Sequence, residues 1–328
     1  MRRCGRAQPG ASSGPWHGPG GRRLADIGCA AAGQNGPGVT NLVTGLAQAK
    51  AALSPVIAIA GSLSSAHQYR DAFQEVDQTS LLSTVTKRSV LVPSTDRIAE
   101  LMRDGFRTAI TPKQGPVALN IPRDVLSKSV TQTDDYSPKV RQYDFICGAS
   151  ATSIENAARI VSKAKSPLIL VGGGVKNSRQ SKSVEKLATL LHVPVAMSPG
   201  HGDAVSCDFD LYAGQVGPRG NVVASNLMKT ADVILAIGTR IGFNTTFYSY
   251  DNINPSAKII QVELDPLAIG RFFPVELGIY ADSGEFISSL IHALAGYQPS
   301  KDVTSWTNDF LAKRKQFLSE RESYSSAS

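Results

Sequence analysis

Residues 34–61 read QNGPGVTNLVTGLAQAKAALSPVIAIAG and put a glycine-rich turn, a helix and a short apolar strand one after another. The helix is predicted over residues 38–53. Residues 55–60 have the length and the continuous apolar character of a strand that is covered on both faces. This succession is typical of a parallel sheet with helices packed on it.

The same alternation continues on both sides of a polar segment, residues 131–150. Before it, apolar residues recur at helical spacing over residues 98–110, and Ser94-Thr95-Asp96 is predicted to cap that helix. After it, Thr152 and Glu155 have the spacing of a capping box. Further strands are predicted at 116–121, 167–171, 193–197, 233–237 and 258–264, and further helices near 181–191, 220–230, 284–295 and 306–322.

We therefore predict an α/β protein with two doubly wound, parallel-sheet domains, the second of them Rossmann-like. The predicted parts are a disordered or unrelated start (1–23), a first α/β domain (24–130), a linker (131–150), a second α/β domain (151–298) and a linker helix that leads to a further domain (299–328).

Composition excludes several classes of protein. Hydrophobic residues make up 42% of the chain, and no apolar run approaches the ~18 residues of a membrane span, so we expect neither a disordered nor a membrane protein. Five arginines lie in residues 1–23, which contain no acidic residue, so the rest of the chain is nearly balanced in charge and no nucleic-acid partner is expected. The four cysteines are scattered, which favours a cytoplasmic protein; the arginine-rich start leaves a mitochondrion or plastid open.

Two glycine-rich turns are candidate ligand sites. Gly36-Pro37-Gly38 does not complete a dinucleotide fingerprint, because Asn41 stands where a small residue is needed. The triple glycine at 172–174 belongs to no P-loop. Each turn either brings backbone close to a ligand or only turns the chain tightly. The sequence has no Gly-x-Ser-x-Gly nucleophile elbow, no His-Glu-x-x-His zinc-protease motif and no histidine pair at metal-ligand spacing. Gly202-Asp203-Ala204 departs at its third residue from a Gly-Asp-Gly metal motif. We therefore expect no metal ligands.

Taken together, the motifs resemble thiamine-diphosphate enzymes of the acetolactate synthase group, and among these most of all the sulfoacetaldehyde acetyltransferases. Their order and spacing across both predicted domains make the set specific. The motifs are Gly28-Cys29, residues 34–41, Phe73-Gln74-Glu75, residues 119–124, Gly172-Gly173-Gly174, residues 231–240 and residues 258–266.

Family members have a pyrimidine-binding, a central and a diphosphate-binding domain. The resemblance implies that residues 24–130 are part of the first and residues 151–298 are the second, and that the third is missing from these 328 residues. It also implies thiamine diphosphate with Mg²⁺ as cofactor, a 2-oxo acid or sulfoacetaldehyde as substrate, and a homodimer or tetramer.

By the same resemblance, one group of residues surrounds the aminopyrimidine ring, and Phe73 and Gln74 line the active site across a dimer interface. The first group is Asn35, Gly36, Pro37, Gly38 and Asn41. The family's activating glutamate lies upstream of the Gly-Pro-Gly turn, whereas the first glutamate here is Glu75 and the one upstream acid is Asp26. We therefore expect no catalytic residue in this chain and no turnover by the chain alone.

For the central domain the resemblance implies a site for FAD or ADP. The residues carried over are Gly172, Gly173, Gly174, Gly238 and Arg240. The acetolactate synthases continue with an Asp-Asp pair after that arginine, where this chain has Gly242-Phe243-Asn244. Asp265 and Asp282 follow successive strands and either meet a ribose or adenine or are solvated loop acids. The alternative function is a non-catalytic module that binds FAD or an adenine nucleotide, or pairs with another subunit.

Overall fold

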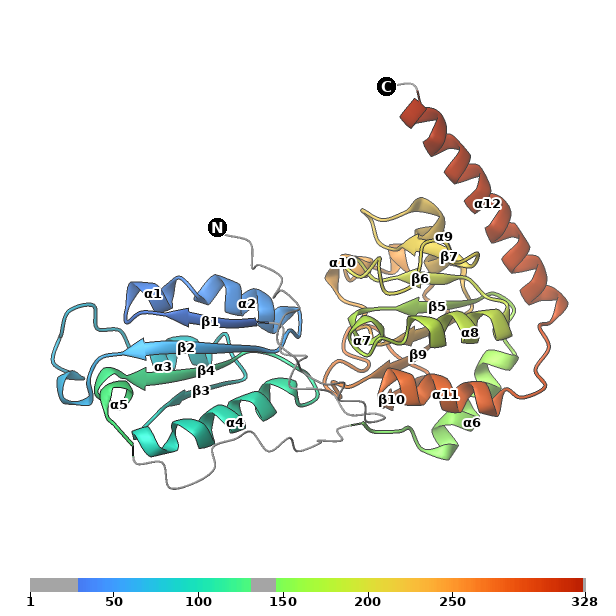
Figure 1. The fold of residues 1–328 in the computed structure, drawn as a ribbon. Coiled ribbons are helices and arrows are strands. Elements are labelled where there is room, and N and C mark those ends of the chain that lie inside the picture. Colours follow the sequence, from blue (N-terminus) through green and yellow to red (C-terminus); the bar gives the residue numbers. More distant parts are fainter. Residues whose placement is uncertain (1–28, 131–145, 327–328) are drawn as a thin grey trace, which may run out of the picture. The chain divides into compact units, whose positions relative to one another are not determined.

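The computed structural model describes residues 29–130 and 146–326, which belong to two compact units, the first before and the second after residues 131–145 in the sequence (Figure 1). The predictions for residues 1–23, for Asp26 and Gly28, and for most of the linker lie outside the described residues. All the strands of both sheets are parallel, which confirms the predicted α/β class. Within the described ranges, no helix is long and apolar enough to cross a membrane.

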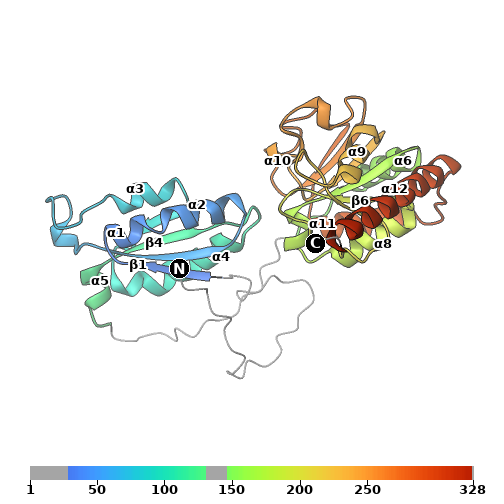
Figure 2. The ribbon, with the colours of Figure 1, turned by 90° about the horizontal axis from the view of Figure 1, so that it is seen from above.

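The first unit is a four-stranded sheet in the order β1-β2-β4-β3. Its elements are β1 (Cys29–Gly33), α1 (Pro37–Thr40), α2 (Val43–Ala51), β2 (Val56–Ser62), η2 (Ser65–His67), α3 (Gln78–Ser83), β3 (Arg88–Leu91), η3 (Thr95–Arg97), α4 (Ile98–Ile110), β4 (Val117–Pro122) and α5 (Arg123–Ser127). Figure 2 shows α2 and α3 on one side of this sheet and α4 and α5 on the other. Ala58 and Ala118 face the α2 side, whereas Ile57 and Leu119 face the α4 side.

The second unit is a six-stranded sheet in the order β10-β9-β8-β5-β6-β7. Its elements are α6 (Ala151–Ser162), β5 (Pro167–Val171), α7 (Gly173–Asn177), α8 (Ser181–Leu191), β6 (Val195–Met197), β7 (Tyr212–Gln215), α9 (Val222–Thr230), β8 (Val233–Ile237), α10 (Phe243–Thr246), η4 (Tyr250–Asn252), β9 (Lys258–Glu263), β10 (Leu277–Tyr280), α11 (Ser283–Ala293) and α12 (Lys301–Ser326). From β5 the strand order runs through β6 and β7 to one edge and through β8, β9 and β10 to the other. In open α/β sheets, ligands bind beyond the carboxyl ends of the strands at such a reversal point.

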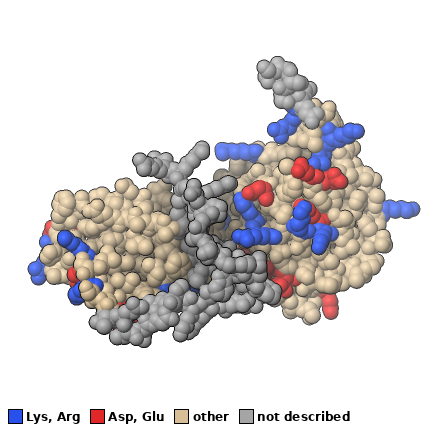
Figure 3. Space-filling model, in the orientation of Figure 1, with Lys and Arg blue, Asp and Glu red and all other residues tan. Residues whose placement is uncertain are grey.

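Charges of both signs are interspersed on the second unit. Figure 3 shows acidic side chains among the basic ones on the face in view. The ion pairs of this unit include Lys182–Glu185 and Lys313–Asp309, with N–O distances of 2.7 and 2.6 Å. Surface ion pairs contribute about 0.2–1 kcal/mol each, so they affect solubility more than the fold.

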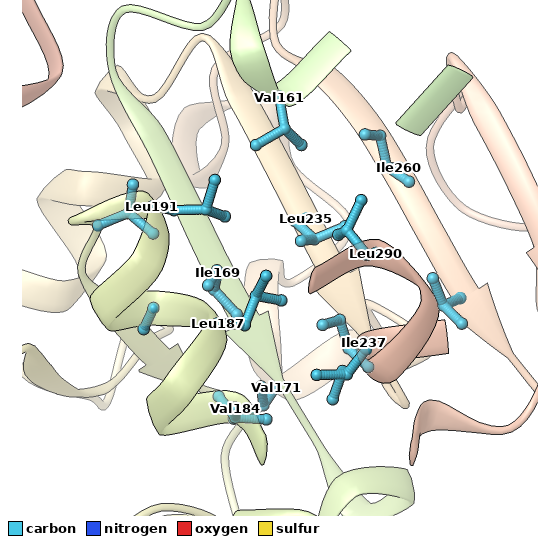
Figure 4. Packing of buried hydrophobic residues seen from close by; sticks show 14 of the residues in the cluster. Val161, Ile169, Val171, Val184, Leu187, Leu191, Leu235, Ile237, Ile260 and Leu290 are labelled. Carbon is cyan, nitrogen blue, oxygen red and sulfur yellow. The ribbon is translucent and has the colours of Figure 1, made fainter. Parts of the chain in front are cut away.

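Alternate residues of β5 explain how this sheet is covered on both faces. Ile169 and Val171 pack with side chains of α8 and α11 (Figure 4), whereas Leu168 and Leu170 belong to the cluster formed with α9 and α12. All four side chains are almost fully buried. Each buried side chain of this size stabilises the fold by about 1.5–3 kcal/mol. A strand that is covered on both faces gains this stabilisation at every position only where its residues are all apolar.

The long helix α12 packs against the amino ends of strands in the second sheet. Its first turns bury Val303 and Phe310. Trp306 Nε1 donates to the carbonyl oxygen of Pro167 at 3.0 Å, and Thr307 Oγ1 donates to that of His192 at 2.7 Å. Pro167 begins β5, and His192 lies shortly before β6. The side chains of α12 therefore contact the amino ends of these strands and leave the carboxyl ends, where the glycine turns lie, uncovered.

Two predicted helix caps are wrong. Ser150, not Thr152, caps α6, because its Oγ accepts the N–H of Ser153 at 3.2 Å and the helix begins at Ala151. Ser94 precedes the short turn η3 and makes no side-chain cap, so α4 begins after Arg97. In both segments several serine and threonine residues compete for the capping position.

Three strands were not predicted: β3, β7 and β10. Each has four residues and lies at the edge of its sheet. An alternating pattern needs more residues than that to stand out. The last helix is also longer than the predicted 306–322, since it runs from Lys301 to Ser326.

Candidate functional site

The turn after β1 is built around Gly36, which has φ +65°. A Cβ atom on Gly36 would lie 2.5 Å from the carbonyl oxygen of Gln74, so only glycine fits. Gly36 N–H donates to Oε1 of the buried Gln78 at 2.8 Å, and Gln78 Nε2 donates to the Gly61 carbonyl at 3.0 Å. One buried amide therefore ties the turn to α3 and to the end of β2.

Two predicted motifs meet at this turn. Asn35 Nδ2 donates to the carbonyl oxygens of Gln74 at 3.3 Å and Phe73 at 3.5 Å, across 38 residues of sequence. The Phe73 side chain is 84% exposed, so its ring is open to a ligand or another surface. The structure thus brings together Asn35, Gly36, Phe73 and Gln74.

The other three residues predicted around the pyrimidine lie in α1 or directly after it. Pro37 is its first residue, and Gly38 lies close to the end of β1, since a Cβ on Gly33 would be 2.7 Å from the Gly38 carbonyl oxygen. Asn41 follows the last residue of α1, its N–H donates to the Pro37 carbonyl at 3.1 Å, and it is exposed. These residues shape the turn with their backbone.

Glu75 holds the loop between β2 and α3. Its carboxylate accepts N–H groups of Tyr69, Arg70 and Ala72. These bonds, that of Ala72 first, lower the pKa of Glu75. The oxygens of Glu75 are therefore engaged by the backbone of its own loop.

The described residues contain no cluster of metal-binding side chains. Across 29–130 and 146–326, no three His, Cys, Asp or Glu side chains gather closely enough to hold a metal ion.

In the second unit the two glycine turns touch each other at the reversal point of the sheet. Gly172 follows β5 and Gly238 follows β8. Gly174 N–H donates to the Gly238 carbonyl at 2.9 Å, and Gly238 has φ +60°. A Cβ on Gly174 would lie 2.6 Å from Gly238 Cα. Close backbone packing therefore requires these glycines whether or not a ligand binds.

The middle glycine of the triplet makes room for a histidine. A Cβ on Gly173 would lie 2.9 Å from Cε1 of His201. Lys176 Nζ and Asp203 Oδ2 form an ion pair at 2.7 Å beside it. Burial, followed by the charge of Lys176, lowers the pKa of His201. Asp203, from the segment that departs from a Gly-Asp-Gly metal motif, thus lies beside the glycine triplet. His201 was missed because nothing in its local sequence marks it.

Glu263 ends β9 at the same edge and is only 8% exposed. Burial raises the pKa of its carboxyl, while the Leu264 N–H, which donates to Oε1 at 2.8 Å, and the positive charge of Arg240 oppose that rise. Arg240 itself is exposed. A buried carboxyl and an exposed guanidinium therefore lie at the carboxyl ends of these strands.

Glu263→Gln is expected to stabilise the protein more at neutral than at acidic pH. A raised pKa in the folded state means that the folded protein holds this proton to higher pH than the unfolded chain, whose glutamate titrates near 4.5. Wild-type stability relative to the variant is therefore highest below pH 4.5 and falls as the pH rises through the raised pKa. Urea unfolding of both proteins at several pH values measures this, and a difference that does not change with pH contradicts it.

The two predicted ribose or adenine ligands have local roles. Asp265 Oδ1 accepts the Leu267 N–H at 3.2 Å, and Asp282 caps α11 by accepting the Gly284 N–H at 2.8 Å. Asp282 is also nearly buried. Both residues follow their strands as predicted, and their local hydrogen bonds account for acidic residues there.

Asp282→Ala is expected to lower the free energy of unfolding by about 1 kcal/mol, because the first turn of α11 loses its side-chain acceptor. Asp282→Asn keeps that acceptor and serves as the control, with an expected loss near zero. Thermal unfolding of the two variants makes the comparison. Equal losses would mean that the charge of Asp282, rather than its capping bond, is what stabilises the fold.

Two models of one protein family match the chain. The N-terminal TPP binding domain of thiamine pyrophosphate enzymes matches residues 21–81, and their central domain matches residues 154–290. These segments contain the Gly36 turn and the edge with Gly172 and Gly238, respectively.

Similar full-length proteins are acetolactate synthase large subunits. That of Corynebacterium glutamicum is 30% identical over 286 residues, which are 86% of this chain and 45% of the relative. The probable large subunit of Methanocaldococcus jannaschii is 32% identical over 291 residues, 86% of this chain and 48% of the relative. The chain spans about half the length of the curated relatives it matches. With two domains of one family matched in one chain, the protein belongs to the thiamine pyrophosphate enzymes.

Proposed function

We propose that this chain provides the pyrimidine side of a thiamine diphosphate site and the central domain of an enzyme that acts on a 2-oxo acid. Sulfoacetaldehyde is the alternative substrate. The observation that carries this proposal is the packing of Asn35 and Gly36 against Phe73 and Gln74. It gathers two family motifs at one turn. The acetolactate synthase relatives support the same class of reaction.

In this proposal each residue of the turn has a binding role. Thiamine diphosphate supplies, when bound, the carbanion chemistry at the substrate carbonyl. The exposed ring of Phe73 offers an apolar contact to the pyrimidine, and Gly36 lets the backbone approach it. Gln78 keeps that backbone fixed through its two hydrogen bonds.

Thiamine itself is a sharp probe for this proposal, because it has the pyrimidine ring and no diphosphate that would need a metal. We expect thiamine at about 100 times its Kd to stabilise the full chain by ~2.7 kcal/mol in thermal unfolding. Phe73→Ala is expected to reduce the shift. Leu126→Ala, which removes another exposed apolar side chain of the first unit, is the matched control and keeps the shift. The absence of any shift with thiamine or with thiamine diphosphate and Mg²⁺ would overturn the proposal.

We propose further that the chain alone does not turn over 2-oxo acids. Glu75 is engaged by its own loop, and the described residues supply no cluster of metal ligands. A coupled assay for CO₂ release from pyruvate by the purified chain measures this. Release above the buffer rate, abolished by Phe73→Ala, would contradict it.

The same family membership supports a homodimer or tetramer. The loop that contains Phe73 also exposes 93% of Tyr69, and two large rings in one loop are an unfavourable surface to leave in water. We expect sedimentation velocity to give at least a dimer at micromolar concentration. A monomer at that concentration contradicts the expectation.

A second candidate function is the binding of FAD or an adenine nucleotide by the central domain. It is favoured by the contact of the two glycine turns at the reversal point of the sheet, with the exposed Arg240 two residues after Gly238. This function does not require the first unit to bind thiamine. Titration of the chain with FAD and with ADP tests it separately.

A further inference from the structure

A long loop connects β2 to α3 and contains two of the residues assigned to the thiamine site, Phe73 and Gln74. It covers residues 63–77, includes the single turn η2, and extends beyond the end of β2 (Figure 1). None of its residues is buried. A segment without buried apolar side chains depends on its hydrogen bonds, and its conformation is easily lost when they are removed.

Residues 69–75 of this loop have an unusual backbone. Tyr69, Asp71 and Gln74 have φ values of 62°, 52° and 62°, in the left-handed region that residues with a Cβ atom rarely adopt. Three such residues within six positions make this conformation unfavourable on its own. Other interactions must therefore hold it in place.

The carboxylate of Glu75 supplies such interactions. Its Oε1 accepts the Tyr69 N–H, and its Oε2 accepts the N–H groups of Ala72 at 2.9 Å and Arg70 at 3.3 Å. Hydrogen bonds to a charged acceptor are stronger than those between neutral groups. The Glu75 N–H in turn donates to the Ala72 carbonyl at 3.0 Å, so one residue closes 69–75 into a ring.

Phe73 and Gln74 lie within this ring and contact the glycine turn through their backbone. Their carbonyl oxygens accept from Asn35 Nδ2 at 3.5 and 3.3 Å. A Cβ on Gly36 would lie 2.5 Å from the Gln74 carbonyl oxygen. Because Glu75 fixes the backbone immediately before Phe73, it determines where this ring and Gln74 lie relative to the turn.

We propose that Glu75 is a positioning residue of the thiamine site, whose carboxylate holds residues 69–75 in the conformation that presents Phe73 and Gln74 to the pyrimidine. Glu75 acts through these two residues and does not touch the ligand. The inference rests on the proposed function and adds to it a residue on which the affinity for the pyrimidine depends.

Glu75→Gln in the full chain tests the inference through thiamine binding, measured by calorimetry. The amide keeps the size of the side chain, but it has no charge and turns an NH₂ group toward N–H donors in place of one oxygen. We expect about 10-fold weaker binding, as for a loop that adopts the presenting conformation in about one molecule in ten. Glu100→Gln, the same change at another exposed glutamate of the first unit, is the matched control and should bind as wild type does.

Two further measurements separate positioning from a general effect on the fold. In Glu75→Gln, amide hydrogen exchange should become faster at Tyr69, Arg70 and Ala72 and stay unchanged in the strands of the first sheet. In a Phe73→Ala background, Glu75→Gln should weaken thiamine binding by less than about threefold, because the ring that it positions is gone. Glu75→Asp keeps the charge and should weaken binding less than Glu75→Gln does.

The outcomes distinguish this inference from the proposed function. If Glu75→Gln binds thiamine as tightly as wild type, the inference fails while the proposed function stands. If wild type binds neither thiamine nor thiamine diphosphate with Mg²⁺, the proposed function fails and the inference fails with it.

Two other results would overturn the positioning role alone. An equal loss of affinity with and without the Phe73 ring would mean that Glu75 does not act through it. Faster exchange throughout the first sheet would mean that Glu75 stabilises the whole unit. Should Glu75→Gln not unfold cooperatively, Glu75→Asp replaces it, with an expected loss of affinity of about threefold and the same contrary results.

Discussion

Gly36→Ala is expected to lower the free energy of unfolding by about 3 kcal/mol and to abolish the response to thiamine. The backbone at φ +65° and ψ −112° costs an alanine about 1–3 kcal/mol, because residues with a Cβ atom rarely adopt this conformation. Its Cβ would also lie 2.5 Å from the Gln74 carbonyl oxygen, so the turn must move away from residues 73–78 and lose the hydrogen bond to Gln78. A buried donor left without its partner costs about 1–3 kcal/mol more.

Gly45→Ala is the matched control for this variant. Gly45 lies on the exposed side of α2, and nothing lies within 4 Å of a Cβ placed there. Alanine in a helix interior should stabilise the protein by about 0.5–1 kcal/mol. Urea unfolding of the two variants compares them directly. If both change stability by the same small amount, the turn is not held by its packing against Gln74.

Gly238→Ala is expected to destabilise the second unit by about 3 kcal/mol or more. The residue has φ +60°, and its Cβ would lie 2.7 Å from Gly174 Cα and 2.8 Å from the Val175 nitrogen, so two backbone segments would have to separate. The cost falls on the core as well, because these segments continue β5 and β8 at the centre of the sheet.

Calorimetry of Gly238→Ala beside Gly148→Ala isolates the effect of packing. Gly148 is exposed, does not have a positive φ, and has nothing within 4 Å of an added Cβ. We expect its replacement to change stability by less than about 0.5 kcal/mol. A loss for Gly238→Ala as small as that for Gly148→Ala would mean that the two glycine turns are not in close contact.

Long apolar segments made the centre of each sheet predictable from sequence. Residues 56–60, 167–171 and 233–237 have no charge to expose, and the structure buries most of their side chains between helices. The edge strands β3, β7 and β10 are too short for such a pattern. Caps were mispredicted for a related reason, because neighbouring hydroxyl residues offer equivalent local hydrogen bonds and tertiary packing selects one.

The residues of the sites were predictable only where a motif lies in the turn itself. The resemblance assigned Asn35 and Gln74 to one active site, but their direct contact could not be predicted from spacing, since the residues are far apart in sequence. His201 carries no such signal. Its place beside the glycine triplet became visible once the fold had brought it onto Gly173.

The adjacency of β5 and β8 also has a consequence for how the protein is made. The Ser166 N–H donates to Oδ1 of Asp232 just before β5 and β8 begin, across 66 residues of sequence. At roughly 5–20 residues per second, a ribosome needs about 3–13 s to synthesise the interval, during which β5 lacks its partner β8. The unit therefore acquires its two-sided sheet, and with it the meeting point of the glycine turns, in one late, slow, long-range step.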